Sequence, residues 1–350
     1  MEPIVSIICV CHNDIKWFKR FFQSVQDQTI SNRLEIIMVD NASADGSPEL
    51  LTKEIAAFPQ SLLVQTGGDY GYGVGCNRGA ANARGKYLFF VNPDIWFEPD
   101  CLQQLVHHAE CSTATVFTLK ELPYQGDLPA GGFFGHGQGA AGFDVFGCLV
   151  GPRPNEKLKQ VFAVGSFYFI RKKLFDQLGG FDREFYLYNE EMDLSWRARI
   201  AGEMVESIPS ARLHHASICP ATPRPARTNV DRRFYANRSQ LLTILKNAQG
   251  LLLFTALTYT MLITVESVAG AVAGRQPAFI YWSLFKPVAD CWRLRSYLRA
   301  QRKQINAYRK YGDWWFIRNF LRFDFSHWHD IKRFIKPIAL LFMLSGHGQF

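Results

Sequence analysis

The sequence predicts an α/β protein built on a mostly parallel β-sheet that is flanked by helices. Over the first hundred residues, apolar β-branched runs alternate with segments whose apolar residues recur at helical spacing. Two runs, 4–10 and 34–39, are apolar at nearly every position, as in strands buried on both faces of a parallel sheet. Hydrophobic residues make up 48% of the 350 residues, so the chain can bury a large core and is not mainly disordered.

Apolar runs, helix-start residues and glycine-rich segments predict where each strand and helix of the first hundred residues lies. The expected strands are 4–10, 34–39, 62–64 and 87–91. The expected helices are 15–26, one that begins at Ser47-Pro48-Glu49 with proline at its first position, and one near 76–84 after a Gly-rich segment at 67–75. Strands joined by helices in this way form βαβ units, which makes the sheet mainly parallel.

The middle of the chain combines a long loop with further elements. Residues 120–160 are rich in glycine and contain four prolines, so we predict a loop, with 126–151 as a flap that closes over a ligand. The elements expected after it are a strand at 161–170, a short helix that ends at Gly179-Gly180, a helix that begins in the acidic cluster 190–193, and a last strand over 205–208 and 212–215.

The composition changes near residue 226, so we divide the chain into a domain at 1–225 and a helical, basic and aromatic region at 226–350. Between 271 and 336 there are 14 Lys/Arg and 4 Asp/Glu. The net charge of this segment is therefore +10, which exceeds the formal charge of +8 for the whole chain. Cations mixed with tryptophan and tyrosine are attracted to an anionic membrane surface. A solvated basic face and an aromatic helical core are the alternatives. Nucleic acid is not expected as a partner, because long apolar runs accompany the charge.

The apolar stretch 251–273 is long enough to cross a bilayer, which needs about 20 apolar residues. Its hydroxyl residues and Glu266 favour instead a helix that lies in the membrane interface, or a buried helical hairpin. The eight cysteines include no CxxC pair, and Cys9 and Cys11 are expected in the core on one face of a strand. With no signal peptide before the strand at 4–10, we expect a reduced, cytoplasmic protein.

Polar side chains follow three of the expected strands at the point where each strand ends. They are His12-Asn13, Asp40-Asn41, and Asn92 with Asp94. One such group is explained by an ordinary turn, whereas three of them at the carboxyl ends of parallel strands predict a ligand site. Oxygen ligands such as those of Asn92 and Asp94 suit Mg²⁺ or Mn²⁺, and Asp40 suits a base or ribose. Together they suit a nucleoside diphosphate.

Two later clusters add groups that can transfer protons or bind metal. Glu190, Glu191 and Asp193 stand at a helix start, where acids also complement the helix dipole. One of these carboxylates near the metal is suited to be the general base for an alcohol. His214 and His215 end the last strand, and one of them is expected to complete the metal shell as a neutral imidazole.

Residues 1–220 resemble the family-two inverting glycosyltransferases of the GT-A fold. The resemblance is carried by six motifs in order: SIICVCHN (6–13), VDNASADGS (39–47), GYGVGCNRG (71–79), FVNPD (90–94), GGFD (179–182) and YNEEMDLSWR (188–197). The Asn-Pro-Asp form at 92–94, and the later segment from Arg238 to Lys246-Asn247, look most like the rhamnosyltransferase-like subgroup of bacterial surface-polysaccharide assembly, which includes O-antigen synthesis.

The resemblance implies a role for each matching residue. The residues implied to bind the nucleotide sugar are Asn13, Asp40, Asn41, Ser43, Asn77, Arg78, Asn92 and Asp94. Glu191 is implied as the catalytic base, with Glu190 as the alternative. The implied metal ligands are Asp94 and His215, with His214 as the alternative. Two positions depart from the family pattern, since Asn92 replaces the usual first Asp of the metal motif and Glu191 replaces the commoner Asp.

The expected function is therefore inverting transfer of rhamnose or a similar sugar in cell-surface glycan synthesis. The expected donor is a dTDP- or UDP-sugar with Mg²⁺ or Mn²⁺, and the expected acceptor is a glycan linked to a polyprenyl diphosphate. The enzyme is expected on the cytoplasmic face of the plasma membrane as a peripheral protein. The alternative is a catalytically silent scaffold of the same fold. A dinucleotide-dependent oxidoreductase is disfavoured, because the glycines at 71–75 lack the GxGxxG spacing and do not follow the first strand.

Overall fold

The computed structural model describes residues 2–58, 60–123, 139–153, 156, 158–165, 167–216, 230–274 and 276–323. These residues form two compact units. The first unit holds the described residues of 1–142, 151–223 and 309–311, and the second holds those of 143–150, 224–308 and 312–350.

The first unit contains a sheet of eight strands in the order β3-β2-β1-β4-β9-β6-β10-β5. The strands are β1 (Val5–Cys11), β2 (Leu34–Asp40), β3 (Ser61–Gln65), β4 (Tyr87–Val91), β5 (Ile95–Phe97), β6 (Val116–Pro123), β9 (Tyr168–Arg171) and β10 (Val205–His215). Only β9 and β5 run antiparallel to their neighbours. The predicted α/β class with a mostly parallel sheet is confirmed.

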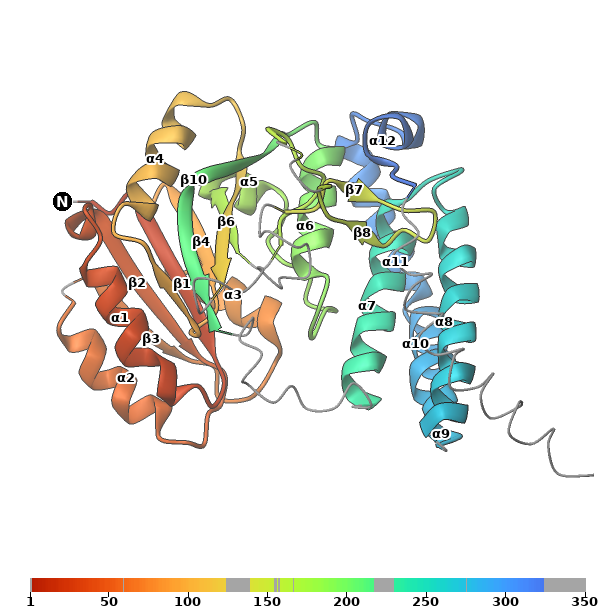
Figure 1. The fold of residues 1–350 in the computed structure, drawn as a ribbon, viewed down its shortest axis with the longest axis horizontal. Helices are drawn as coiled ribbons and strands as arrows, with labels where there is room; N and C mark the ends of the chain where they lie inside the picture. The colour runs from red at the N-terminus through yellow and green to blue at the C-terminus, as the bar shows by residue number, and fades with distance from the viewer. Residues whose placement is uncertain are drawn as a thin grey trace, which may run out of the picture. The chain divides into compact units, whose positions relative to one another are not determined.

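Helices cover both faces of this sheet. One core joins the sheet to α1 (Phe18–Gln26), α2 (Ser47–Ala56) and α4 (Cys101–Cys111). The other joins it to α3 (Tyr72–Ala80), α5 (Lys172–Gln177) and α6 (Glu190–Ile200) (Figure 1). Successive residues of β1 enter opposite cores, with Cys9 and Cys11 in the first as predicted and Ile8 and Val10 in the second.

Several elements differ from the sequence-based prediction. The helix α4 and most of β6 were not predicted. Within the described part of 161–170 a strand forms only over β9, whereas β10 continues from Val205 to His215 with a register shift between Ile208 and Arg212. Residues 124–138, which include half of the predicted flap, lie outside the described residues.

The rest of the predicted flap lies within the described residues, and its residues 143–150 belong to the second unit. Its strands β7 (Gly142–Phe143) and β8 (Leu149–Val150) form a small hairpin. The Gln240 amide donates to the Gly147 carbonyl at 2.6 Å, and the Thr258 hydroxyl donates to the Val145 carbonyl at 2.7 Å. These bonds fix the hairpin to two helices, so this part of the segment is a structural element.

The predicted helical C-terminal region is present in the second unit. Its helices are α7 (Val230–Asn247), α8 (Phe254–Gly274), α9 (Ala278–Ile280), η4 (Tyr281–Phe285), α10 (Lys286–Arg293), α11 (Arg295–Tyr308) and α12 (Asp313–Phe320). Among the described residues, only Phe254–Val272 of α8 is long and apolar enough to cross a membrane, by length and composition alone. Trp328, part of the predicted aromatic tail, lies outside the described residues.

Candidate active site

The direction of the strands brings the predicted polar residues to one edge of the sheet. β1, β2 and β4 are parallel, with Cys11 beside Asp40 and Cys9 beside Val91. β9 is antiparallel to both β4 and β6, and β10 is parallel to β6, so β4, β6 and β10 all end at the same edge. Asp40, Asp94 and His215 therefore belong to one edge, as the sequence predicted.

His215 connects two carboxylates at this edge. Its Nε2 lies 3.2 Å from Oδ1 of Asp94, and its Nδ1 lies 2.6 Å from Oε1 of Glu121 at the end of β6. Burial alone would lower the pKa of His215, but the hydrogen bonds to Asp94 and Glu121 outweigh it and raise the pKa to about 9. Without a metal, the ring is therefore an imidazolium at neutral pH.

His214, the alternative metal ligand, lies on the other face of β10, because successive side chains of a strand alternate. Its ring stacks on Trp96 at a centroid distance of 5.1 Å, and its Nε2 lies 2.6 Å from Oε1 of Glu98. The guanidinium of Arg20 covers the same tryptophan at 3.4 Å. Of the two expected histidines, the structure thus places His215, and not the alternative His214, against Asp94.

The loops that follow β1 and β2 are hydrogen-bonded to each other. The Asn13 backbone nitrogen donates to Ser43 Oγ at 3.0 Å, and Asn13 Oδ1 accepts from the Ala44 backbone nitrogen at 2.8 Å. Asn13 has a positive φ of 61° and Ala42 one of 62°, a strained conformation that often marks ligand sites. Asp40 is buried beneath them and accepts from the Ser43 nitrogen at 3.3 Å. These hydrogen bonds fix the conformation of both loops at the carboxyl edge of the sheet before any ligand binds.

Asn41 and the Gly-rich loop are held by Asp69, which sequence reasoning did not select. Asp69 Oδ1 accepts from Asn41 Nδ2 at 2.8 Å, and its Oδ2 accepts from the Tyr186 hydroxyl at 2.5 Å. The carboxylate therefore joins segments from three parts of the chain. An acid inside a Gly-rich loop gave no sequence signal for this role, because the partners are distant in sequence.

The two residues predicted from the third motif make contacts within the protein. The Asn77 side chain donates to the Phe181 carbonyl at 2.7 Å and accepts from the Phe181 nitrogen at 2.9 Å, so it fixes the loop before α6. The Arg78 guanidinium donates to the Thr66 carbonyl at 2.6 Å and lies 4.4 Å from the ring of Tyr70. Tyr70 is about half exposed, so Arg78 supports an aromatic surface beside the predicted nucleotide site.

The two predicted bases open α6. This helix leads through Gly202 directly into the start of β10, so its first turn lies at the carboxyl edge of the sheet. Tyr188 and Asn189, just before it, have positive φ values of 69° and 65°. This strained entry orients the first turn, where Glu190 and Glu191 stand side by side.

The two carboxyl groups differ in how deeply they are buried. Glu190 is 3% exposed, its Oε2 has no hydrogen-bond partner among the described residues, and burial together with the Glu191 charge raises its pKa well above the usual range. Glu191 is half-buried, and desolvation raises its pKa to about 7. A pKa near 7 suits a general base, so Glu191 is the better candidate, whereas burial disfavours the charged form of Glu190. The third acid, Asp193, is buried in an ion pair with Arg197 at 2.9 Å, which is a structural role.

The donor set at the edge fits a divalent cation bound partly by substrate. Asp94 offers a carboxylate oxygen and His215 an imidazole nitrogen, and Asn92 stands half-buried two residues before Asp94. Within the described ranges no group of three or more His, Cys, Asp or Glu residues forms a closed metal site. Mg²⁺ and Mn²⁺ commonly take one or two protein ligands and complete their shell with diphosphate oxygens and water. Glu121, found only in the structure, would orient the imidazole.

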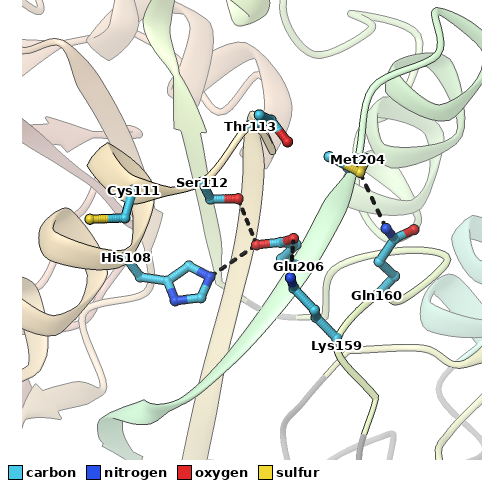
Figure 2. Close-up of a pocket in the computed structure, with 8 residues that line it drawn as sticks. All are labelled: His108, Cys111, Ser112, Thr113, Lys159, Gln160, Met204 and Glu206. Atoms are coloured by element: carbon cyan, nitrogen blue, oxygen red, sulfur yellow. Dashed lines mark hydrogen bonds and ion pairs between the residues drawn. The ribbon is translucent and has the colours of Figure 1, made fainter.

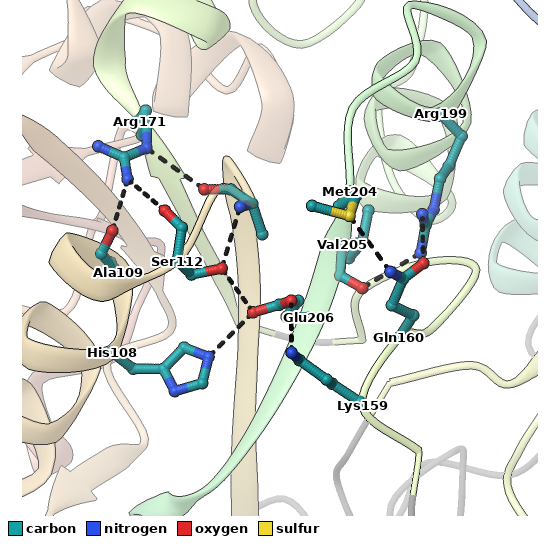
Figure 3. Close-up of polar contacts among 11 residues, drawn as sticks. His108, Ala109, Ser112, Lys159, Gln160, Arg171, Arg199, Met204, Val205 and Glu206 are labelled. Atoms are coloured by element: carbon teal, nitrogen blue, oxygen red, sulfur yellow. Dashed lines mark hydrogen bonds and ion pairs between the residues drawn. The ribbon is translucent and has the colours of Figure 1, made fainter.

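A cavity of about 280 Å³ lies at the other end of β10, and Figure 2 shows the side chains that line it. Glu206 is 2% exposed and lies 2.9 Å from His108 Nε2, 2.8 Å from Ser112 Oγ and 3.9 Å from Lys159 Nζ (Figure 3). Nine strand residues separate Glu206 from His215, which is roughly 25–30 Å. Because its polar groups already satisfy each other, we interpret this cluster as a link between α4 and β10.

Comparison with known proteins agrees with this geometry. Residues 6–179 match Glycosyl transferase family 2. The chain is 24% identical over 245 residues to the N-acetylglucosaminyl-diphospho-decaprenol L-rhamnosyltransferase of Mycobacterium tuberculosis, covering 61% of this chain and 77% of that one. It is 26% identical over 227 residues to rhamnosyltransferase WbbL of Escherichia coli, and the alignment covers 61% of this chain and 83% of that one. A shorter alignment, 32% identical over 114 residues, covers 33% of this chain and 33% of the putative glycosyltransferase EpsH of Bacillus subtilis.

Solved structures show the fold. The crystal structure of GalNAc-T7 with UDP, GalNAc and Mn²⁺ superposes with a TM-score of 0.57 at 16% identity, over 70% of this chain and 48% of that one. The S. aureus protein TarS, residues 1–349 with UDP, superposes with a TM-score of 0.52 at 16% identity, over 88% and 89%. The predicted GT-A fold is confirmed.

Proposed function

Because the chain belongs to glycosyl transferase family 2 and is a glycosyltransferase of the rhamnosyltransferase type, we propose that it moves rhamnose or a similar sugar from a nucleoside-diphosphate donor to a hydroxyl of a glycan. The observation that supports the proposal is that Glu191, whose pKa desolvation raises to about 7, belongs to the same sheet edge as Asp94 and His215. These are the groups that glycosyl transfer from a diphosphate requires.

The reaction is a single displacement with inversion. Glu191 takes the proton of the acceptor hydroxyl, and the oxygen attacks the anomeric carbon from the face opposite the diphosphate. The bond to the diphosphate breaks as the new glycosidic bond forms, and the nucleoside diphosphate leaves. Asp40 and the loop held by Asn13 and Ser43 orient the nucleoside, with Asn41, Arg78 and Asn92 beside it. Burial raises the pKa of Glu190 and so disfavours its charged form, which leaves Glu191 as the proposed base.

A divalent metal is proposed as the cofactor. Mn²⁺ accompanies UDP in the GalNAc-T7 structure, and Mn²⁺ accompanies GDP-mannose in a mannosyltransferase from Pyrobaculum calidifontis of the same fold. In this chain Asp94 and His215 would hold it. When bound, the cation supplies positive charge that stabilises the leaving diphosphate. Glu121 keeps the His215 ring in place.

A lipid-linked acceptor and a location at the membrane complete the proposal. The name of the mycobacterial relative specifies a decaprenol diphosphate carrying N-acetylglucosamine. We assign catalysis to residues 1–225 and membrane association to the basic, aromatic residues 226–350. The enzyme would then work at the cytoplasmic face of the plasma membrane, where such acceptors are extended.

A donor screen tests the proposal. The full-length protein is mixed with dTDP-, UDP- and GDP-sugars, with and without Mn²⁺ or Mg²⁺, and its melting temperature and donor hydrolysis are measured. We expect one dTDP- or UDP-sugar to stabilise the protein and to be hydrolysed slowly in the presence of metal. Asp94→Asn should lose both effects. Binding without any turnover would support a silent scaffold, and no stabilisation by any donor would refute the proposal.

A further inference from the structure

The helix α8 of the second unit turns large apolar side chains toward solvent. They recur every three or four residues and are 46–62% exposed: Phe254, Leu257, Met261, Val265, Val268 and Val272. This spacing places them on one face of the helix. A run of six exposed apolar residues along a helix of 21 residues is not the pattern of a helix that meets water.

The polar side chains of α8 face the opposite way, into the protein. Ser267 is 1% exposed and accepts from or donates to Ser283 Oγ of η4 at 2.6 Å, and the Tyr259 hydroxyl lies 3.1 Å from Asn237 Oδ1 of α7. Glu266 is paired with Arg233 of α7. α8 thus buries these polar side chains together with Leu262 and Ile263, whereas its exposed side is apolar.

Two further threonine hydroxyls on α8 are satisfied within the helix itself. Thr260 donates to the Ala256 carbonyl and Thr264 to the Thr260 carbonyl, both at 2.7 Å. Neither hydroxyl therefore depends on water for a partner. This arrangement suits a medium without hydrogen-bonding partners.

A second apolar stripe runs along the neighbouring helical segment, η4 and α10. Its members are 39–71% exposed and also recur at helical spacing: Tyr281, Phe285, Val288 and Trp292. The Asn237 amide of α7 donates to the Ser283 carbonyl of η4 at 2.6 Å, so α7 packs against this segment as well as against α8. α8 also contacts η4 directly, so the two stripes lie on neighbouring helices of the same bundle (Figure 1).

Cations follow the second stripe. Between 286 and 303 there are six Lys or Arg residues and one acid, Asp290. Arg293, Arg295 and Arg299 are exposed, and the Arg295 guanidinium lies 5.5 Å from the ring of Trp292. Tryptophan beside arginine at the end of an apolar stripe suits the headgroup region of an anionic bilayer.

We propose that these two stripes form a membrane-contact face, on which α8 lies in the plane of an anionic bilayer with its outward side chains at the boundary between headgroups and acyl chains. α8 does not span in this arrangement, because α7 packs along it and carries the exposed charges Asp231 and Arg232. A second copy of the chain is a poorer occupant, because the arginines would face each other. The inference specifies the membrane association proposed above, and it does not require sugar transfer.

Vesicle flotation of the full-length protein tests this face. Vesicles are made of phosphatidylcholine alone or mixed with phosphatidylglycerol, and no donor or acceptor is added. We expect strong binding only with phosphatidylglycerol. Met261→Glu should weaken binding at least about tenfold, because an apolar side chain is lost from the contact and a charge is added. Replacing Arg293, Arg295 and Arg299 by Gln should weaken binding to anionic vesicles about fivefold for each cation.

The matched control is Leu62→Glu, which adds the same charge at an apolar residue of β3 that is 41% exposed outside the face. It should float like the unaltered protein, and every variant should keep its melting temperature and its donor hydrolysis in solution. Equal flotation of Met261→Glu and the unaltered protein would overturn the proposal. A change of Met261→Glu from dimer to monomer with unchanged flotation would also overturn it, because the face would then serve self-association. Failure of alkaline carbonate to release the protein from membranes would overturn it as well, because α8 would then span the bilayer.

Discussion

Replacing Glu191 by Gln should abolish sugar transfer and at the same time stabilise the fold. The change removes the base but keeps the shape of the side chain, so donor affinity should remain. The stabilisation follows from the pKa of Glu191, which desolvation raises from 4.5 to about 7. A raised carboxyl pKa means that the folded site favours the neutral form. This contribution makes the unaltered protein lose stability as the pH rises from about 4.5 to about 7, and the Gln variant lacks it.

The size of the effect can be worked from the same values. Moving a carboxyl pKa from 4.5 to about 7 costs at most about 3 kcal/mol above pH 7. Because the side chain is only half-buried, solvent screens part of this cost, and we expect about 1–2 kcal/mol. For a chain of this size that corresponds to a rise in melting temperature of about 1–3 °C at pH 8, and to none below pH 4.5.

Thermal unfolding of both proteins across this pH range measures the stability, and transfer or slow donor hydrolysis measures the activity. Glu49→Gln is the matched control, because Glu49 also stands in the first turn of a helix but is exposed. It should change neither activity nor the pH dependence of melting. An active Glu191→Gln enzyme would remove Glu191 as the base, and a Gln variant that melts below the unaltered protein at pH 8 would show that desolvation does not act on this carboxyl.

Three further predictions concern the metal pair and the structural cluster. Glu121→Gln should weaken Mn²⁺ binding about 10–100-fold in a calorimetric titration, because His215 loses its orienting partner, and unchanged affinity would contradict this. Apparent Mn²⁺ affinity should rise from pH 6 to about pH 9, because a proton and the metal compete for His215, whose pKa is about 9; a flat profile would exclude His215 as a ligand. Glu206→Ala should destabilise the protein by about 1–3 kcal/mol in urea unfolding, because Ser112 loses its buried acceptor, while the donor affinity stays unchanged.

Much of the first unit could be predicted because parallel strands buried on both faces have a clear sequence pattern. β1, β2 and β4 were expected within one or two residues of their observed bounds, and their shared direction placed Asp40 and Asp94 at one edge. Residues whose roles depend on distant partners could not be found in this way. Glu121 and Asp69 are ordinary acids in the sequence, and their functions follow only from His215 and Asn41, which lie far away along the chain.

The second unit shows a different limit. The run of apolar residues in 251–273 gave the length of α8, but length and composition are the same for a core helix, a spanning helix and an interfacial helix. The distinction depends on which side of the helix meets protein. That side was set by Asn237, Tyr259 and Ser283, which belong to separate helices and become neighbours only after the bundle forms.

The charges at the sheet edge link the fold to the proposed chemistry. Asp14 is held there by its hydrogen bond from the His12 nitrogen, yet burial together with the charges of Asp94 and Asp45 raises its pKa. In the protein alone, protonated His215 places a positive charge against Asp94 at this edge. A divalent cation bound at Asp94 would take over this charge and displace the proton from Nε2. Without substrate, the positive charge of His215 therefore partly balances the acids at this edge. A metal that arrives with the diphosphate would take over that role, so an anionic donor can bind next to several acids.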